Sequence, residues 1–208
     1  LRRFRAADGA LVTNAEVTGL SRIGADWQVE TPGQTMRAPI IINAAGAWAD
    51  VIAEMAGVAI KGLRPLRRTA LLVDPPAGMV PDVWPMVVDV EEQFYLKPDA
   101  GQLLISPADE TLSEPCDAQP EELDIAICVD RIQTAFDLQI RRIDHKWAGL
   151  RSFLPDGDPV AGYAPDAPGF FWLAGQGGYG IQSAPAMARS AAALVQGLDL
   201  PGDVADLG

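Results

Sequence analysis

The residues best suited to chemistry form a glycine-rich turn near the carboxyl end of the chain. Four glycines, at positions 175, 177, 178 and 180, separate the apolar run Phe170 to Ala174 from an alanine-rich stretch, 182–196, that is expected to be helical. Glycines leave backbone N–H groups uncovered, and a helix start adds the positive end of its dipole. Such a turn suits a carboxylate, a phosphate or the pyrimidine edge of a reduced flavin. Tight packing alone would explain the glycines equally well.

A second candidate backbone site lies near residue 45. The apolar run Ile40 to Ile42 predicts a strand buried on both faces, and the small residues of Asn43-Ala-Ala-Gly-Ala-Trp48 follow it directly. Ligands of open α/β sheets bind at the carboxyl ends of such strands, where small residues let the backbone approach closely. Ordinary packing of a helix on a sheet would also account for this composition.

Three polar side chains in apolar surroundings complete the candidate chemistry. Arg68 begins a strand-like run, Tyr95 lies in Phe-Tyr-Leu-Lys-Pro, and Arg151 ends Trp-Ala-Gly-Leu-Arg. A guanidinium grips a carboxylate at two points, and a phenol hydroxyl can add a further donor. Spacing along the chain does not bring the three together, so each taken singly fits a surface or core-edge position as well.

The elements expected to position these residues form an α/β protein with a mixed sheet. A helix is predicted from Pro120, with Glu121 and Glu122 in its first turn and a buried stripe of Leu123, Ile127, Ile132 and Phe136. Another helix is predicted through about Met55. Short apolar runs between turn residues predict strands at Leu11 to Val17, Trp27 to Thr31, Pro39 to Asn43, Arg68 to Val73, Met86 to Val90, Phe94 to Lys97, Leu103 to Ser106, Arg141 to Phe153 and Phe170 to Ala174.

The composition limits the classes of function. Hydrophobic residues make up 49% of the 208 residues, enough for a sizeable core. The formal net charge of −12 would repel phosphate backbones, so no nucleic-acid partner is expected. The same charge would mildly favour cationic small molecules, although an acidic surface also serves solubility.

Cysteine and histidine are too sparse for a protein-built zinc site. Cys116 and Cys128 form no CxxC pair, and His145 is the sole histidine, so no metal is expected. Two isolated cysteines fit a reducing compartment, which predicts a cytoplasmic location, including one peripheral to the inner membrane. No apolar run of 18 residues occurs, so no transmembrane span is expected.

The first residues predict that the chain starts inside a domain. Leu1 to Gly9 lacks an initiator methionine and has the pattern of a helix end closed by a glycine. It also lacks the apolar core of a signal peptide.

Several motifs together resemble the superfamily of D-amino-acid oxidase, glycine oxidase and sarcosine oxidase, and most closely the D-arginine dehydrogenases. The resemblance spans essentially the whole chain, and its motifs are specific in combination. They are Asn43 to Trp48, Arg67 to Ala70, Trp84 to Met86, Phe94 to Gly101, Gln119 to Glu121, Leu123 to Ala126, Trp147 to Phe153, Asp156 to Asp158 and Gly169 to Gln182.

The resemblance implies a role for each candidate residue. Arg68, Tyr95 and Arg151 would hold the carboxylate of an amino-acid substrate, and the Gly178 carbonyl would face its amine. Two further sets would contact the cofactor, FAD: Ala44, Ala45 and Gly46 would pack near it, and Gly178, Tyr179, Gly180, Ile181 and Gln182 would lie along the isoalloxazine edge. The FAD would be bound without a covalent link, because no cysteine lies in Trp147 to Asp156.

The resemblance also implies a division into domains. Residues 1–63 and 149–208 would belong to an FAD-binding domain and residues 64–148 to a substrate-binding domain. The opening strand of such a fold, with the GxGxxG turn that binds the pyrophosphate, is absent here, and so are the N-terminal residues, including an acidic group, that would recognise a cationic side chain. Preference for a basic amino acid is therefore implied by similarity alone.

The resulting expectation is an FAD-dependent enzyme that oxidises the CH–NH2 group of D-amino acids such as D-arginine. The imino acid formed would hydrolyse to a 2-oxo acid and ammonia, and the electron acceptor stays undetermined. Two alternatives stay open. One is a glycine or sarcosine type of amine oxidase that uses oxygen. The other is a non-catalytic fragment unable to bind FAD by itself, with its flavin crevice open to solvent or to self-association.

Overall fold

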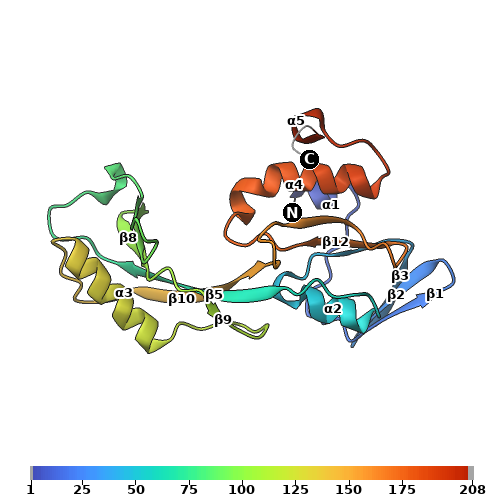
Figure 1. The fold of residues 1–208 in the computed structure, drawn as a ribbon, viewed down its shortest axis with the longest axis horizontal. Helices are drawn as coiled ribbons and strands as arrows, with labels where there is room; N and C mark the ends of the chain where they lie inside the picture. The colour runs from blue at the N-terminus through green and yellow to red at the C-terminus, as the bar shows by residue number, and fades with distance from the viewer. Residues whose placement is uncertain (1, 206–208) are drawn as a thin grey trace. The chain divides into compact units, whose positions relative to one another are not determined.

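The computed structural model describes residues 2–205, which form two compact units (Figure 1). The first unit comprises residues 2–61, 160–174 and 181–205, and the second comprises residues 62–159 and 175–180. Both units contain helices and strands, so the chain is an α/β protein, as the sequence pattern predicted. Leu1 and residues 206–208, at the outer ends of the segments assigned to an FAD-binding domain, lie outside the described residues.

The first unit contains two small sheets and four α-helices. One sheet is an antiparallel meander of β1 (Gly19–Ile23), β2 (Asp26–Thr31) and β3 (Gln34–Ala38). In the other sheet, β12 (Phe170–Ala174) pairs with β11 (Val160–Tyr163) in the antiparallel sense and with β4 (Ile41–Asn43) in the parallel sense. The remaining elements are α1 (Arg2–Ala6), the 3-10 turn η1 (Gly46–Trp48), α2 (Ala49–Met55), α4 (Gly180–Val195) and α5 (Gly202–Ala205).

Strand β12 forms the centre of the first unit's core. Phe170, Phe171 and Trp172 are almost completely buried, and Trp27 of β2 meets the Phe170 ring edge-on at 5.8 Å. The turn before β12 needs a glycine, because Gly169 has φ +82° and a Cβ there would lie 2.3 Å from the Pro39 carbonyl oxygen. This close approach of backbone to backbone holds the start of β12 against the segment that leads into β4.

The second unit is a six-stranded sheet covered by one helix. Its main strand order is β10-β5-β8-β7-β6, and β9 pairs with β5. The helix α3 (Glu122–Ala135) packs on the sheet (Figure 1). The strands are β5 (Arg64–Val73), β6 (Val87–Val88), β7 (Tyr95–Asp99), β8 (Gln102–Ser106), β9 (Thr111–Leu112) and β10 (His145–Phe153), with a 3-10 turn, η2 (Pro81–Val83), before β6.

Alternation along β5 gives the sheet of the second unit two different faces. Leu71 and Val73 point into a core with Ile125, Cys128 and Ile132 of α3. The even-numbered residues of β5 therefore point to the opposite face, away from α3. Arg68 is one of these residues, whereas its neighbour Arg67 points toward the helix.

Most of the predicted elements are present, and three expectations were wrong. Leu11 to Val17 forms no strand, and Leu11 and Val12 are exposed there. Strand β4 is not buried on both faces, because Ile42 is 49% exposed. The buried stripe of α3 consists of Ile125, Cys128 and Ile132, whereas the predicted Leu123 is 69% exposed. The predicted stripe began on the wrong residue, because the direction in which a helix faces its sheet is set by tertiary packing.

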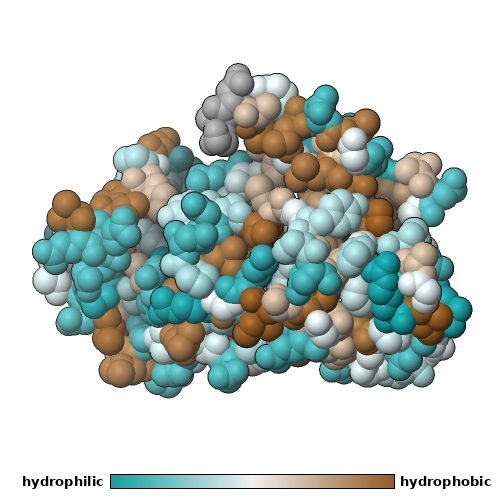
Figure 2. Space-filling model, turned by 45° about the vertical axis from the view of Figure 1, so that its right-hand side comes forward, coloured by the Kyte–Doolittle hydropathy of each residue, from teal (hydrophilic) through white to brown (hydrophobic). Residues whose placement is uncertain are grey.

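The surface mixes apolar and polar side chains on the face shown in Figure 2. Within residues 2–205, no helix is long and apolar enough to cross a membrane. The same residues contain no cluster of three or more His, Cys, Asp or Glu side chains arranged to hold a metal ion.

The two cysteines should differ sharply in reactivity. Burial raises the pKa of Cys128 to about 12, the nearby Asp109 carboxylate adds to this, and Cys116 is exposed. We expect Ellman's reagent to label Cys116 in the folded protein and Cys128 only after denaturation, because the thiolate is the reactive form. Cys116→Ser is the control and should remove the fast reaction. Rapid labelling that persists in this variant would contradict the burial of Cys128.

Candidate substrate cavity and flavin-contact segments

Register between β5 and β10 brings Arg68 and Arg151 onto one face of the sheet. Arg68 pairs with Gly149, and Arg151 pairs with Leu66 two residues earlier on β5. Cross-strand partners point to the same face, so the two arginines are diagonal neighbours. Gly149 adds no side chain between them, and a Cβ at this position would meet no atom within 4 Å. Two guanidinium groups therefore share the face opposite α3.

This face forms one wall of a cavity of about 830 Å³ that lies entirely within the second unit. The cavity contains all four residues expected to bind substrate: Arg68, Tyr95, Arg151 and Gly178. Its other lining residues are Met86, Val88, Glu91, Glu92, Gln93, Phe94, Lys97, Ala108, Glu110, Phe153 and Tyr179. Spacing along the sequence did not predict that these segments lie together, whereas strand pairing in the sheet brings them together.

The Arg68 guanidinium is held by the loop that follows β8. Its Nε donates to the Asp109 carbonyl oxygen at 2.9 Å, and an Nη donates to a carboxylate oxygen of Glu110 at 2.8 Å. The side chain is 13% exposed, so the charge is largely screened from bulk water. These two hydrogen bonds therefore fix the direction of the Arg68 guanidinium, and they occupy some of its N–H donors.

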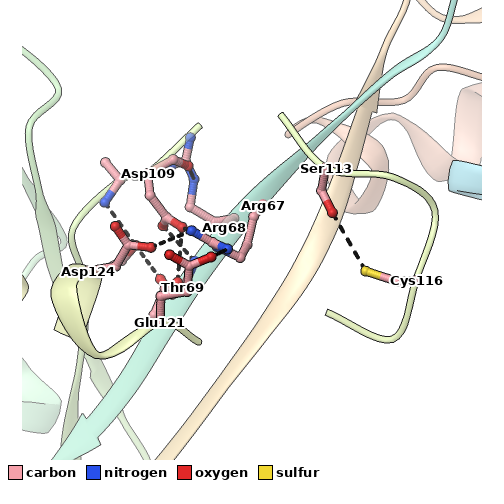
Figure 3. A network of polar contacts seen from close by, with 10 residues as sticks. Arg67, Arg68, Thr69, Asp109, Ser113, Cys116, Glu121 and Asp124 are labelled. Atoms are coloured by element: carbon pink, nitrogen blue, oxygen red, sulfur yellow. Dashed lines mark hydrogen bonds and ion pairs between the residues drawn. The ribbon is translucent and has the colours of Figure 1, made fainter. Parts of the chain in front are cut away.

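The loop itself is fastened to β5 by the Asp109 carboxylate (Figure 3). Asp109 accepts the backbone N–H of Thr69 at 2.6 Å and the Thr69 hydroxyl at 2.9 Å. One residue before the loop, the Ser106 hydroxyl donates to the Thr69 carbonyl at 2.6 Å and accepts the Ala108 N–H at 3.1 Å. Both ends of Thr69, which is completely buried, are thus tied to the loop.

Arg67 has a structural role on the other face of the sheet. It is paired with Glu121 and, at 2.7 Å, with Asp124, both at the amino end of α3, and its Nε lies 3.6 Å from Asp109 (Figure 3). Burial alone would lower the pKa of Arg67, but the hydrogen bonds with Glu121 and Asp124 raise it above its ordinary value. Adjacent arginines of β5 therefore serve different ends: Arg67 joins helix, loop and sheet, and Arg68 points into the cavity.

Arg151 differs from Arg68 in lacking an anionic partner. Across residues 2–205 it forms no ion pair or hydrogen bond, although it is partly buried. Its pKa is lowered first by burial and then by the positive charge of Arg68, and the charges of Tyr95, Glu110 and Asp109 oppose this shift. An arginine stays protonated at neutral pH even so. A desolvated cation beside a second cation is an arrangement that a bound anion would stabilise.

The cavity carries both signs of charge. Lys97 joins the two arginines as a third cation, and Glu91, Glu92 and Glu110 supply three carboxylates. Sequence reasoning identified none of these four residues. Only Lys97 lay within a recognised motif, Phe94 to Gly101. The three glutamates lie in loops, where hydrophobic periodicity does not indicate the direction in which a side chain points.

The glycine-rich turn packs directly against the strand that carries Arg151. A Cβ on Gly177 would lie 2.4 Å from the Phe153 ring, and one on Gly178 would lie 3.1 Å from Nη1 of Arg151. The Gly177 N–H donates to the Ser152 carbonyl at 2.9 Å. Packing against Phe153 thus explains Gly177, while Gly178 is exposed on the cavity wall, where the absence of a Cβ leaves room for the Arg151 guanidinium.

The second candidate turn lies in the first unit, after β4. The Asn43 side chain is buried, donates to the Ala49 carbonyl at 2.8 Å and accepts the Ala45 N–H at 3.4 Å, which fixes the turn. Gly46 has φ +57°, and a Cβ there would meet no atom within 4 Å. Ala44 and Gly46 are exposed. This uncovered backbone fits the close approach of a flat ring, as the exposed Gly178 and Tyr179 backbone does in the second unit.

Comparison with known proteins identifies the family. A family model described as FAD dependent oxidoreductase (DAO) matches residues 1–194. The chain therefore belongs to the family of FAD-dependent oxidoreductases, whose cofactor is FAD.

The chain is similar to several curated proteins and solved structures. FAD-dependent oxidoreductase domain-containing protein 1 of Xenopus laevis is 28% identical over 93% of this chain and 41% of its own length. Human mitochondrial sarcosine dehydrogenase is 27% identical over 82% of the chain and 20% of its own length. The structure of glycine oxidase from Geobacillus kaustophilus superposes with a TM-score of 0.80 at 23% identity, over 98% of the chain and 54% of that protein.

The chain thus spans about two fifths of the length of the frog relative and about half of the superposed glycine oxidase. The likeness to glycine oxidase shows the shared fold. The named relatives do not single out D-arginine dehydrogenase.

Removal of the Asp109 carboxylate should destabilise the second unit. Asp109→Ala leaves the buried N–H and hydroxyl of Thr69 without acceptors, which costs about 1–3 kcal/mol for each unsatisfied group. We expect a clearly lower midpoint of urea denaturation followed by tryptophan fluorescence. Asp117→Ala, at an exposed aspartate on a later loop, is the matched control and should leave the midpoint unchanged. Equal midpoints for both variants would show that the loop does not depend on Asp109.

Proposed function

We propose that the protein binds the carboxylate of an amino acid in the cavity of the second unit and oxidises its amine with FAD. The observation that carries this proposal is Arg151, a partly buried guanidinium without an ion-pair partner in the described chain, placed beside Arg68. Two cations that share a cavity wall favour an anionic ligand, and a carboxylate matches the planar fork of a guanidinium.

The proposed grip uses three side chains and one backbone group. Arg151 donates to the carboxylate from its unoccupied fork, and Arg68 adds the donors that Asp109 and Glu110 leave free. Tyr95 on β7 of the same sheet offers a phenol hydroxyl, and the Gly178 carbonyl accepts from the substrate amine. Such a grip fixes the direction of the Cα–H bond, which is the main contribution that an enzyme makes to this chemistry.

FAD, when bound, would supply the acceptor for the hydride from Cα. The chain's own residues orient the substrate, and the apolar side chains of Met86, Val88, Phe94 and Phe153 on the cavity wall exclude water from it. No side chain is needed as an obligatory base if the amine has lost its proton before transfer. The imino acid then hydrolyses to a 2-oxo acid and ammonia.

We propose two segments for contact with the flavin, each described within its own part of the chain. Ala44, Ala45 and Gly46 supply the uncovered turn after β4. Gly178 to Gln182, from the glycine turn into the first turn of α4, would lie along the isoalloxazine edge, because the first N–H groups of a helix lack intrahelical acceptors and favour negative charge. Residues 1–63 and 149–208 would then belong to the FAD-binding domain and residues 64–148 to the substrate domain.

For the substrate we propose D-amino acids with a cationic side chain, such as D-arginine. The sequence resemblance leads to this choice, and Glu91 and Glu92 on the cavity wall would attract a cationic group. The cytoplasm is the proposed location.

A second candidate is oxidation of glycine or an N-methylated amino acid with transfer of electrons to oxygen. The similarity to human sarcosine dehydrogenase and to glycine oxidase favours it. Assays of the whole flavoprotein distinguish the two candidates: D-arginine should reduce the flavin under the first, and glycine or sarcosine under the second, with peroxide as product if oxygen is the acceptor.

Substitution of Arg151 should weaken substrate binding strongly. In the whole flavoprotein, Arg151→Met removes a charge-assisted pair, and we expect KM for the best substrate to rise about 10- to 100-fold. Arg141→Met, at an exposed arginine that does not line this cavity, is the control and should keep the KM of the parent protein. An unchanged KM in Arg151→Met would refute the carboxylate role.

The flavin should be released intact when the protein is denatured. Cys116 and Cys128 do not line the cavity, so we expect no thioether link to either. Acid precipitation of the whole flavoprotein should leave the yellow colour in the supernatant, as measured by absorbance. A yellow pellet would indicate covalent attachment and contradict this expectation.

A further inference from the structure

Glu110 is the cavity residue whose carboxylate is paired with the Arg68 guanidinium. Its carboxylate accepts from an Arg68 Nη at 2.8 Å, and the preceding residue's carbonyl holds the Nε of the same guanidinium. The Glu110 side chain is 59% exposed and lines the cavity. It therefore presents a negative charge to the cavity, next to the cations that would receive a substrate carboxylate.

The loop that carries Glu110 is rigidly anchored. Asp109 ties it to Thr69 of β5, and β9, which starts at Thr111, pairs with β5 through Arg67. On the other side of the loop, the Arg131 guanidinium of α3 donates to the Pro107 carbonyl at 3.0 Å. A charge on such a loop does not simply move away when an anion enters, so its effect on the cavity persists in the bound state.

We propose that Glu110 is a specificity-determining residue that makes the cavity select zwitterionic amino acids over carboxylates that lack an amine. This inference rests on the proposed function and names the substrate class of the same site. A carboxylate without an amine is attracted by the charges of Arg68 and Arg151 but repelled by the charge of Glu110. The carboxylate of an amino acid is repelled by Glu110 in the same way, but the attraction between Glu110 and the ammonium group of the amino acid offsets this repulsion.

The charge on Glu110 also explains why the two arginines differ. Glu110 and the Asp109 carbonyl occupy part of the Arg68 fork, whereas Arg151 has no such partner. With Glu110 present, the charges of the Arg68–Glu110 pair cancel, and Arg151 is left as the net positive charge for one carboxylate. The local group of Arg68, Arg151 and Glu110 thus has one net positive charge, which suits a singly charged carboxylate, and Glu110 then favours ligands that bring a cation as well.

A matched pair of ligands tests this without turnover. We would measure binding to the whole, FAD-containing protein by isothermal titration calorimetry, with 2-aminoisobutyrate and isobutyrate. They share a carbon skeleton and differ in the amine, and 2-aminoisobutyrate cannot be oxidised because it has no Cα–H. The variants are Glu110→Gln, which keeps the size and a hydrogen bond to Arg68, and Glu110→Asp, which keeps the charge. Glu114→Gln, at an exposed glutamate away from the cavity, is the control.

The preference for 2-aminoisobutyrate over isobutyrate should shrink about fivefold in Glu110→Gln, mainly through tighter binding of isobutyrate, because removal of one partly solvated charge relieves the repulsion of the plain anion. Glu110→Asp and Glu114→Gln should keep the preference of the parent protein. An unchanged preference in Glu110→Gln would overturn the inference, since a merely positioning role affects both ligands equally.

The failure of the proposed function would look different. In that case neither ligand would bind the parent protein, and Arg151→Met would change nothing, so the carboxylate site itself would be refuted together with this inference. If both ligands bind, depend on Arg151 and respond equally to Glu110→Gln, only the role of Glu110 is wrong.

Discussion

The long antiparallel pairing of β5 with β10 is the constraint on which the second unit depends. It joins residues 64–73 to residues 145–153, which are about 80 positions apart along the chain, so it brings together segments that no local preference could join. Alternation of side chains along these strands then sorts residues between two faces. One face packs on α3, and the other carries Arg68 and Arg151. A slip of one residue in this register would turn Arg68 into the core and Arg67 into the cavity.

The Asp109 loop completes what the strands begin. Strand pairing fixes the backbone of Arg68 and the face of the sheet to which its side chain points. Because this side chain is long and has several rotatable bonds, further contacts are needed to hold its guanidinium in one direction. The Asp109 carbonyl and the Glu110 carboxylate supply them, and the Asp109 carboxylate fixes that loop to Thr69. Arg67 and its carboxylate partners on α3 tie the same region to the helix. The direction of the Arg68 guanidinium in the cavity is thus set by polar contacts within the second unit.

The division of labour in the cavity follows from the type of reaction. In the proposed reaction, hydride removal would belong to the flavin, so the protein would need no strong nucleophile or metal ligand of its own. The protein would supply charge and shape: cations for the carboxylate, a backbone oxygen for the amine and an apolar wall for the rest. Arginines and glycines would then be the most informative residues, although they rarely stand out by residue type alone.

The sequence by itself determined the α/β class, most strands of both units and the two small-residue turns, because hydrophobic period and glycine placement are local signals. Its motif combination also indicated the flavoprotein family before any contact was known. Arg68 and Arg151 were identified by their motifs, but nothing along the chain showed that they lie close together. The sequence also did not indicate that Arg67 and Arg68 point to opposite faces of the sheet. Tertiary structure alone decided these points, together with the direction of α3 and the place of Glu110. The physical reason is that strand register, helix orientation and loop anchoring depend on contacts between distant residues, which local sequence preferences do not encode.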